Sequence, residues 1–311
     1  MNRWITGCLL LTLPCVSACH GGWGIALGNI DRAREDFHYT AQLNPGGRLE
    51  VETRNGSVEV VAWDRDRVEV SGTKYADSRE RLRQVQVAMD SSPNRLRIHT
   101  QGPDTFNGHY GAKYVIHVPT RTVVDTIETS NGAVHLEGLE GKARVRTSNG
   151  AIRVSRLEGD LDAHTSNGRI EITGLKGAAM IRTSNGSVQM DEVRGALDVA
   201  TSNGSVKARV ADPEAHKPIR VETSNGSVEL AFDQLRENPV RVRTSNSSIT
   251  MRLPVNANAQ LSASTSHGTV KSELEMDATR NDKTHLEAKL GSGGPPVSLS
   301  TSNGSIKLLR N

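Results

Sequence analysis

The four residues Thr-Ser-Asn-Gly recur along this 311-residue chain at a nearly constant spacing, and no other feature constrains the fold as strongly. The spacing is identical across five consecutive copies, from Asn131 to Asn203, and the steps that follow, as far as His267, are slightly longer. A fixed short period is typical of structural units that stack on one another. The motif begins at Thr129, Thr147, Thr165, Thr183, Thr201, Thr223 and Thr301, with variants at Thr53, Thr244 and Thr265.

A single unit, residues 142–159, shows how the chain would fold. Apolar and polar residues alternate over 143–147 and again over 152–154. This period of two indicates two short strands that each bury one face. Asn149-Gly150 between them is a turn pair, because both residues tolerate positive φ. The sequence therefore predicts an all-β fold, a single-chain β-solenoid with coils of about 18 residues.

An Asn-Gly pair between alternating strands is also a strong hairpin signal, so antiparallel hairpins in a meander or barrel are the alternative. The repeat favours the solenoid, because the same residues recur in the same order and the first five units keep one length. Stacked asparagines can hydrogen-bond to one another along such a column. We expect a buried structural ladder of Asn131, Asn149, Asn167, Asn185, Asn203, Asn225, Asn246 and Asn303.

Aromatic residues make up only 3% of the chain, and most of them lie between residues 37 and 120. Alternating segments there predict several strands, and residues 76–84 fit a short helix. A solenoid also needs cover for the open strand edge of its end coil. We therefore predict a β-rich N-terminal cap over residues 37–120 and the solenoid over residues 121–311.

The C-terminal part departs from the regular spacing. His267 takes the ladder position in its copy of the motif, and Asn303 follows it at twice the basic period. We expect a degenerate coil between them. The last coil, which begins at Thr301, has only residues 309–311 after it to blunt its edge, so self-association through the solenoid ends is possible.

The first residues resemble an export signal. A positive start precedes an apolar run from Ile5 to Leu13, and small residues lead to Cys19. The segment before Cys19 is similar to a lipobox, which implies a signal peptide over residues 1–18, lipidation of Cys19 and a tether over residues 19–36. Ordinary cleavage after Ala18 is the alternative. A lipid-anchored outer-membrane protein is favoured, since His20 replaces the Asp of an inner-membrane retention signal.

The sequence offers little for catalysis or for small ligands. The ten histidines are scattered without the spacing of a metal site. No nucleophile elbow and no phosphate-binding loop is present. The net charge of +3 is spread along the chain, which does not predict a nucleic-acid-binding face. We expect no metal, no cofactor, no nucleic-acid partner and no enzymatic activity.

Residues 58–68, followed by serial Thr-Ser-Asn-Gly units, resemble a bacterial family of β-strand-repeat proteins regarded as adhesins and otherwise of unknown function. The resemblance covers about residues 45–308 and implies a β-solenoid in an envelope protein. The family has no agreed catalytic residues to carry over to this chain.

Three functions are compatible with the sequence. The first is an adhesin-like or structural envelope lipoprotein, whose rod contacts an unknown protein or surface partner, because solenoids offer extended binding faces. The second is a periplasmic scaffold or envelope sensor that self-assembles. The third, which we disfavour, is a polysaccharide-active β-helix enzyme, because such a site needs paired carboxylates and an aromatic platform.

Overall fold

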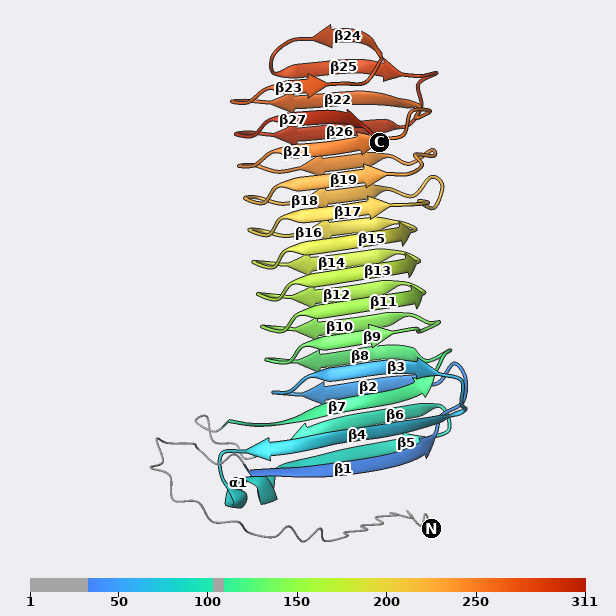
Figure 1. Ribbon diagram of the computed structural model, residues 1–311, viewed down its shortest axis with the longest axis vertical. Coiled ribbons are helices and arrows are strands. Elements are labelled where there is room, and N and C mark those ends of the chain that lie inside the picture. The colour runs from blue at the N-terminus through green and yellow to red at the C-terminus, as the bar shows by residue number, and fades with distance from the viewer. Residues whose placement is uncertain (1–32, 103–108) are drawn as a thin grey trace, which may run out of the picture. The chain divides into compact units, whose positions relative to one another are not determined.

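The computed structural model describes residues 33–102 and 109–311. The predicted signal peptide, Cys19 and most of the predicted tether lie outside these residues. The described residues form 27 strands and one short helix, α1 (Arg79–Gln84) (Figure 1). The strands are β1 (Ala33–Gln42), β2 (Arg48–Thr53), β3 (Val58–Trp63), β4 (Arg67–Ala76), β5 (Gln86–Ser92), β6 (Arg95–Gln101), β7 (Tyr110–Pro119), β8 (Val123–Thr129), β9 (Val134–Glu137), β10 (Ala143–Thr147), β11 (Ile152–Glu158), β12 (Leu161–Thr165), β13 (Ile170–Lys176), β14 (Ala179–Thr183), β15 (Val188–Arg194), β16 (Leu197–Ala200), β17 (Val206–Val210), β18 (Ile219–Glu222), β19 (Val228–Phe232), β20 (Val240–Arg243), β21 (Ile249–Leu253), β22 (Ala259–Thr265), β23 (Val270–Ser272), β24 (Asp277–Asn281), β25 (His285–Leu290), β26 (Pro296–Thr301) and β27 (Ile306–Arg310).

The strands belong to two facing sheets. Sheet A has the order β1-β4-β7-β3-β9-β11-β13-β15-β17-β19-β21-β27-β23, and sheet B has the order β24-β25-β22-β26-β20-β18-β16-β14-β12-β10-β8-β2-β6-β5. From β8 to β21 the chain alternates between the sheets, so each pair of consecutive strands makes one coil. Neighbouring coils are parallel, with Ala143 opposite Leu161 and Ile152 opposite Ile170. The predicted β-solenoid is confirmed, and the antiparallel alternative is wrong for these repeats.

Small aliphatic side chains fill the space between the sheets. In β10 the residues alternate between buried and exposed, as the period of two requires. Val145, Ala163 and Ile181 occupy one inward position in three successive coils, and none of them is exposed. Burying one such valine or isoleucine contributes about 1.5–3 kcal/mol. Repetition of these positions joins the interior into one continuous core, which explains why the repeats need so few aromatic residues.

The N-terminal end continues the coil pattern before it closes. β2 pairs in parallel with β8 on one side and β6 on the other, and β3 pairs in parallel with β9 and β7. The segment expected as a cap thus supplies coils in register with the repeats. Antiparallel strands β1, β4 and β5 then finish the two sheets. Helix α1 begins three residues later than expected, because the Ser78 side chain accepts a hydrogen bond from the Arg81 backbone N–H and caps it.

The C-terminal end differs from the expected order of coils. Residues 273–295 do not form a degenerate coil, since β24 and β25 make an antiparallel hairpin that pairs with β22. All five residues of β24 are exposed, so this strand has no apolar face to bury inside a coil. The expectation that the last coil forms an open end is also wrong. β26 and β27 lie between β20/β21 on one side and β22/β23 on the other.

Candidate binding groove and the Thr-Ser-Asn-Gly columns

The threonine hydroxyl holds most of the Thr-Ser-Asn-Gly turns together, although the buried Thr129 Oγ1 has no hydrogen-bond partner among the described residues. Thr165 is 6% exposed. Its Oγ1 donates to the Gly150 carbonyl of the preceding coil at 3.1 Å and accepts from the Gly168 N–H at 3.1 Å. Thr147 and Thr223 make the same two bonds. A buried hydroxyl with both partners carries no desolvation penalty, so threonine closes the turn and bonds it to the neighbouring coil.

The glycine of the motif is required for a different reason from the one the sequence indicated. Neither Asn167 nor Gly168 has positive φ. A Cβ on Gly168 would lie 1.7 Å from the Gly150 carbonyl oxygen of the coil below. Glycine lets the turns stack this closely, and in the variant motif at Thr244 the same position is taken by the small residue Ser247. Positive φ occurs at other corners, as in Gly174 with φ of 69° and Gly159 with φ of 150°.

The eight predicted ladder asparagines lie in one row of side-chain hydrogen bonds. In each rung the Nδ2 of one asparagine donates to the Oδ1 of the previous one, with donor–acceptor distances between 2.6 and 2.8 Å. The expected burial is wrong, because these side chains lie on the exposed outside of the turns. The rungs join Asn131, Asn149, Asn167, Asn185, Asn203, Asn225, Asn246 and Asn303.

The ladder also has a member that sequence reasoning left out. Asn131 donates to Asn55, and Asn55 donates in turn to the Tyr110 carbonyl at 2.8 Å, which ends the row. The variant motif at Thr53 was the signal that could have identified Asn55. At the opposite end the coil of His267 stacks on that of Asn303, and an imidazole replaces the next amide.

A groove of about 870 Å³ runs across sheet B along the N-terminal ends of β8, β10, β12, β14, β16 and β18. Much of its lining is apolar. Met180 is 47% exposed there, with Ala178, Ala179 and Ala196 beside it. Sequence reasoning did not find this groove, because its floor comes from residues that are far apart in the chain and chemically plain.

The groove exists because one outward position changes size from coil to coil. Lys142 and Asp160 occupy it in two coils, whereas Ala178 and Ala196 occupy it in the next two. The alanines leave space between longer side chains. At one end Arg48 lines the groove, and at the other end Pro218 and Arg220 do. The signal in the sequence is an alanine after the corner glycine in two consecutive repeats, Gly177-Ala178 and Gly195-Ala196.

Ion pairs between neighbouring coils border this floor. Asp160 binds Lys142 at 3.0 Å and accepts a hydrogen bond from the Ala178 backbone N–H at 3.1 Å. The Lys142 ammonium, together with this N–H, holds the pKa of the Asp160 carboxyl below its usual range. Three further pairs repeat the arrangement at 2.9–3.2 Å, namely Arg48–Asp125, Arg144–Asp162 and Arg182–Asp198. The groove therefore offers an apolar floor between fixed positive and negative charges.

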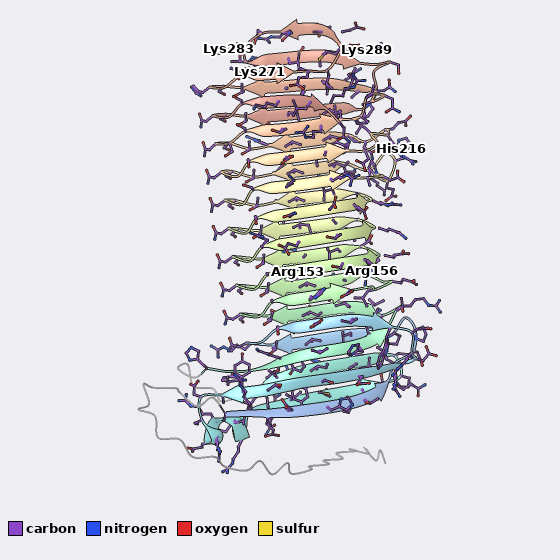
Figure 2. All side chains as sticks on the ribbon, viewed as in Figure 1. Arg153, Arg156, His216, Lys271, Lys283 and Lys289 are labelled. Atoms are coloured by element: carbon purple, nitrogen blue, oxygen red, sulfur yellow. The ribbon has the colours of Figure 1, made fainter. Side chains whose placement is uncertain are left out.

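A second, smaller cleft of about 530 Å³ lies along sheet A at the bend of β11, β13 and β15. The bend residue has left-handed φ in each of the four coils that line this cleft, and it is glycine at Gly138 and Gly174 but Arg156 and Glu192 in the other two. Figure 2 shows Arg156 and Arg153 extending outward from the same coil. Arg156 pairs with Glu137, and Arg153 pairs with Glu171 at 2.8 Å.

Two further observations concern membranes and metals. Across residues 33–102 and 109–311, no helix is long and apolar enough to cross a bilayer. In the same part of the chain, no group of three or more His, Cys, Asp or Glu side chains is arranged to hold a metal ion.

A comparison with solved structures found matches from several bacteria. A proposed adhesin from Bacteroides fragilis is 14% identical, with a TM-score of 0.37 over 88% of this chain and 97% of that one. A proposed adhesin from Parabacteroides merdae is 8% identical, with a TM-score of 0.33 over 88% and 96%. A proposed cell adhesion protein from Clostridium sporogenes is 8% identical, with a TM-score of 0.23 over 89% and 100%. These scores are too low to carry an argument about function.

A comparison with curated proteins found no match to this chain. The family model described as Toastrack DUF4097 matches residues 47–309, which covers the coils at both ends as well as the regular repeats. The chain therefore belongs to the Toastrack DUF4097 family.

Proposed function

We propose that this protein is a non-enzymatic lipoprotein of the cell envelope, anchored through Cys19, with an adhesin-like binding role. The sheet B groove is the proposed docking surface, and its extent over six strands of successive coils is the observation that carries the proposal. Six strands at about 4.8 Å spacing give a groove on the order of 25 Å long. A length of this kind suits a linear chain.

The lining of the groove favours an extended polypeptide segment of a surface partner. Alanine and methionine side chains on the floor can contact small apolar side chains, while the flanking ion pairs offer both signs of charge. Among the described residues that line the groove, none is aromatic, so the stacking platform that sugars use is not provided by them.

The state of the carboxylates supports a binding role over hydrolysis. Each of the four aspartates that line the groove is within 3.2 Å of an arginine or lysine. A glycosidase needs one carboxyl group that keeps its proton near neutral pH, whereas the Lys142 ammonium holds the pKa of the Asp160 carboxyl below its usual range. This pairing fits a surface with fixed charges.

A charge placed on the floor tests the groove directly. Met180→Lys should reduce binding of the purified protein to intact host cells by about tenfold or more, because the ammonium would have to lose water against an apolar partner surface. Gln189→Lys is the matched control, since Gln189 is exposed on β15 of sheet A and away from the groove. Equal binding by both variants and the wild type would remove the groove from the proposal.

The side of the membrane on which the protein lies decides between adhesion and its alternative. Protease digestion of intact cells should cleave the solenoid if it faces outward, as an adhesin must. Protection in intact cells, with cleavage only after the outer membrane is permeabilised, would contradict the adhesin role and favour the periplasmic scaffold or sensor.

A further inference from the structure

The last coil of the chain is inserted between coils made from earlier residues. β26 and β27 lie between β20/β21 and β22/β23, and residues 291–295 connect them to β25. We propose that this coil is exchangeable, so that two copies of the protein trade residues 296–310 and form a dimer. The inference is independent of the proposed binding groove.

The slot that holds this coil recognises it through the repeat. On one side Asn303 donates to Asn246, and the Ile249 N–H donates to the Ser305 carbonyl at 3.0 Å. On the other side Thr265 Oγ1 donates to the Gly304 carbonyl at 2.7 Å. A second copy would supply the same atoms to the same partners. The closed and exchanged forms therefore differ only in the hinge and in protein concentration.

The connection before the coil has the properties of a hinge. Gly291, Gly293 and Gly294 have φ of 58°, 82° and 158°, and Pro295 and Pro296 follow. Glycines reach extended conformations as readily as these left-handed ones, and prolines favour extended backbone. The hinge can therefore straighten toward a second molecule once the two hydrogen bonds from Ser292 to Asn258 Oδ1 are released.

The outer edges make simple end-to-end stacking less favourable than exchange. β23 has only three residues, and β24 is fully exposed with Asp277 and Arg280 on it. Figure 2 shows Lys271, Lys283 and Lys289 around this end. Short strands and lysines at a sheet edge oppose pairing with another chain. The inserted coil, in contrast, presents matching partners on both of its sides.

Single-cysteine variants can detect the exchange in the full-length chain with Cys8, Cys15 and Cys19 replaced by serine. Arg241 on β20 lies opposite Ser298 on β26, and both side chains are exposed. Adjacent strands are about 4.8 Å apart, within the Cα separation that a disulfide spans. Arg241→Cys and Ser298→Cys copies, unfolded together in urea, refolded and oxidised, should give a disulfide-linked heterodimer.

The matched control uses a pair inside the stack. Arg144 on β10 lies opposite Asp162 on β12, so mixed Arg144→Cys and Asp162→Cys copies have the same spacing without a terminal coil. We expect about tenfold more heterodimer from the first mixture, because the exchanged coil keeps both neighbours. Equal yields from the two mixtures would overturn the proposal. So would no heterodimer from the first mixture, when a single chain carrying both Arg241→Cys and Ser298→Cys forms its internal disulfide.

If the variants at Arg241 or Ser298 do not fold, the neighbouring opposed pair Arg243 and Ser300 provides the same test from the same strands.

Discussion

At the scale of single residues, the glycines of this solenoid have two separate roles. Gly168 has ordinary φ, but a Cβ added to it would lie 1.7 Å from the Gly150 carbonyl oxygen. Gly174 has φ of 69° and its nearest neighbour would be 3.7 Å away. One position disfavours a side chain by close contact, and the other only by backbone conformation, which Arg156 and Glu192 also adopt in neighbouring coils.

The two roles predict different costs for the same substitution. Gly168→Ala should lower the free energy of unfolding by about 3 kcal/mol or more, because the clash is with backbone that cannot move without separating two coils. Gly174→Ala should cost only about 1 kcal/mol, the usual strain of a left-handed alanine. Urea unfolding of both variants measures the difference, and equal costs would contradict this assignment.

The asparagine ladder predicts a modest effect, since its side chains are exposed. Asn167→Ala removes one donated and one accepted hydrogen bond. Water replaces part of each bond, so we expect the free energy of unfolding to fall by about 0.5–1 kcal/mol. Ser166→Ala is the control, because Ser166 is the neighbouring exposed residue outside the ladder. A loss for Asn167→Ala no greater than for Ser166→Ala would mean that the ladder adds nothing to stability.

At the scale of elements, the outermost coil is tied together by a buried contact between β6 and β7. The Tyr114 hydroxyl hydrogen-bonds with Thr100 Oγ1, and the Phe37 ring from β1 packs edge-on against the Tyr114 ring at 5.6 Å between centroids. Tyr114 is 1% exposed. Burial raises the pKa of Tyr114 to about 12, because the phenolate would lose its hydration.

This contact predicts how stability changes in alkali. A folded pKa above the unfolded value of about 10 means that the contribution is complete below pH ~10 and is lost as the pH rises toward ~12. The wild type should lose about 2–3 kcal/mol of unfolding free energy over that range through this residue. Tyr114→Phe should cost about 1 kcal/mol near neutral pH, through the unpaired Thr100, and should flatten the alkaline decline. Urea unfolding from pH ~8 to pH ~11.5 provides the test, and an unchanged decline would assign it to other groups.

At the scale of the whole molecule, rows of alternating charge join neighbouring coils on both sheets. Arg153–Glu171 on sheet A and Lys142–Asp160 at the N-terminal ends of two sheet B strands each connect equivalent positions of two successive coils. The neighbouring arginines hold the pKa of Glu171 below its usual value, and Lys142 does the same for the pKa of Asp160. Each pair is solvent-exposed and contributes little alone. Because the same arrangement recurs along the stack, its effect accumulates.

These lowered pKa values predict sensitivity to acid. A carboxyl group whose folded pKa is depressed contributes stability above its unfolded pKa of about 4, and that stability is lost as the pH falls through the folded value. The urea concentration at the midpoint of unfolding should therefore decrease as the pH is lowered from ~5 to ~2. The double variant Asp160→Asn and Glu171→Gln should be less stable at neutral pH and should show a smaller acid decline. A variant that keeps the full decline would mean that other carboxylates cause it.

Much of this architecture could be predicted from the repeat alone. The alternation in residues 143–147 defines a strand and its inward face, and the constant interval sets the register between coils. The rungs from Asn131 to Asn203 follow from the same interval, whereas the rung between Asn246 and Asn303 passes over the His267 coil in the sequence. The groove could not be predicted in this way, because its floor depends on which small side chains meet across separate coils. Cys19 lies outside the described residues, so its lipidation stays a prediction.

The repeating unit is encoded locally, since its alternation and its turn motif lie within one repeat and recur without reference to the rest of the chain. How the stack ends, in contrast, depends on packing in three dimensions. Two strands match the free side of β21: β23, from the coil that follows it in the chain, and β27, from the C-terminal coil. In the structure β27 takes this place and β23 pairs with β27. Coils built on one motif present nearly identical edges, so sequence order does not specify their spatial order, whereas the packing of the hairpin β24–β25 against β22 does.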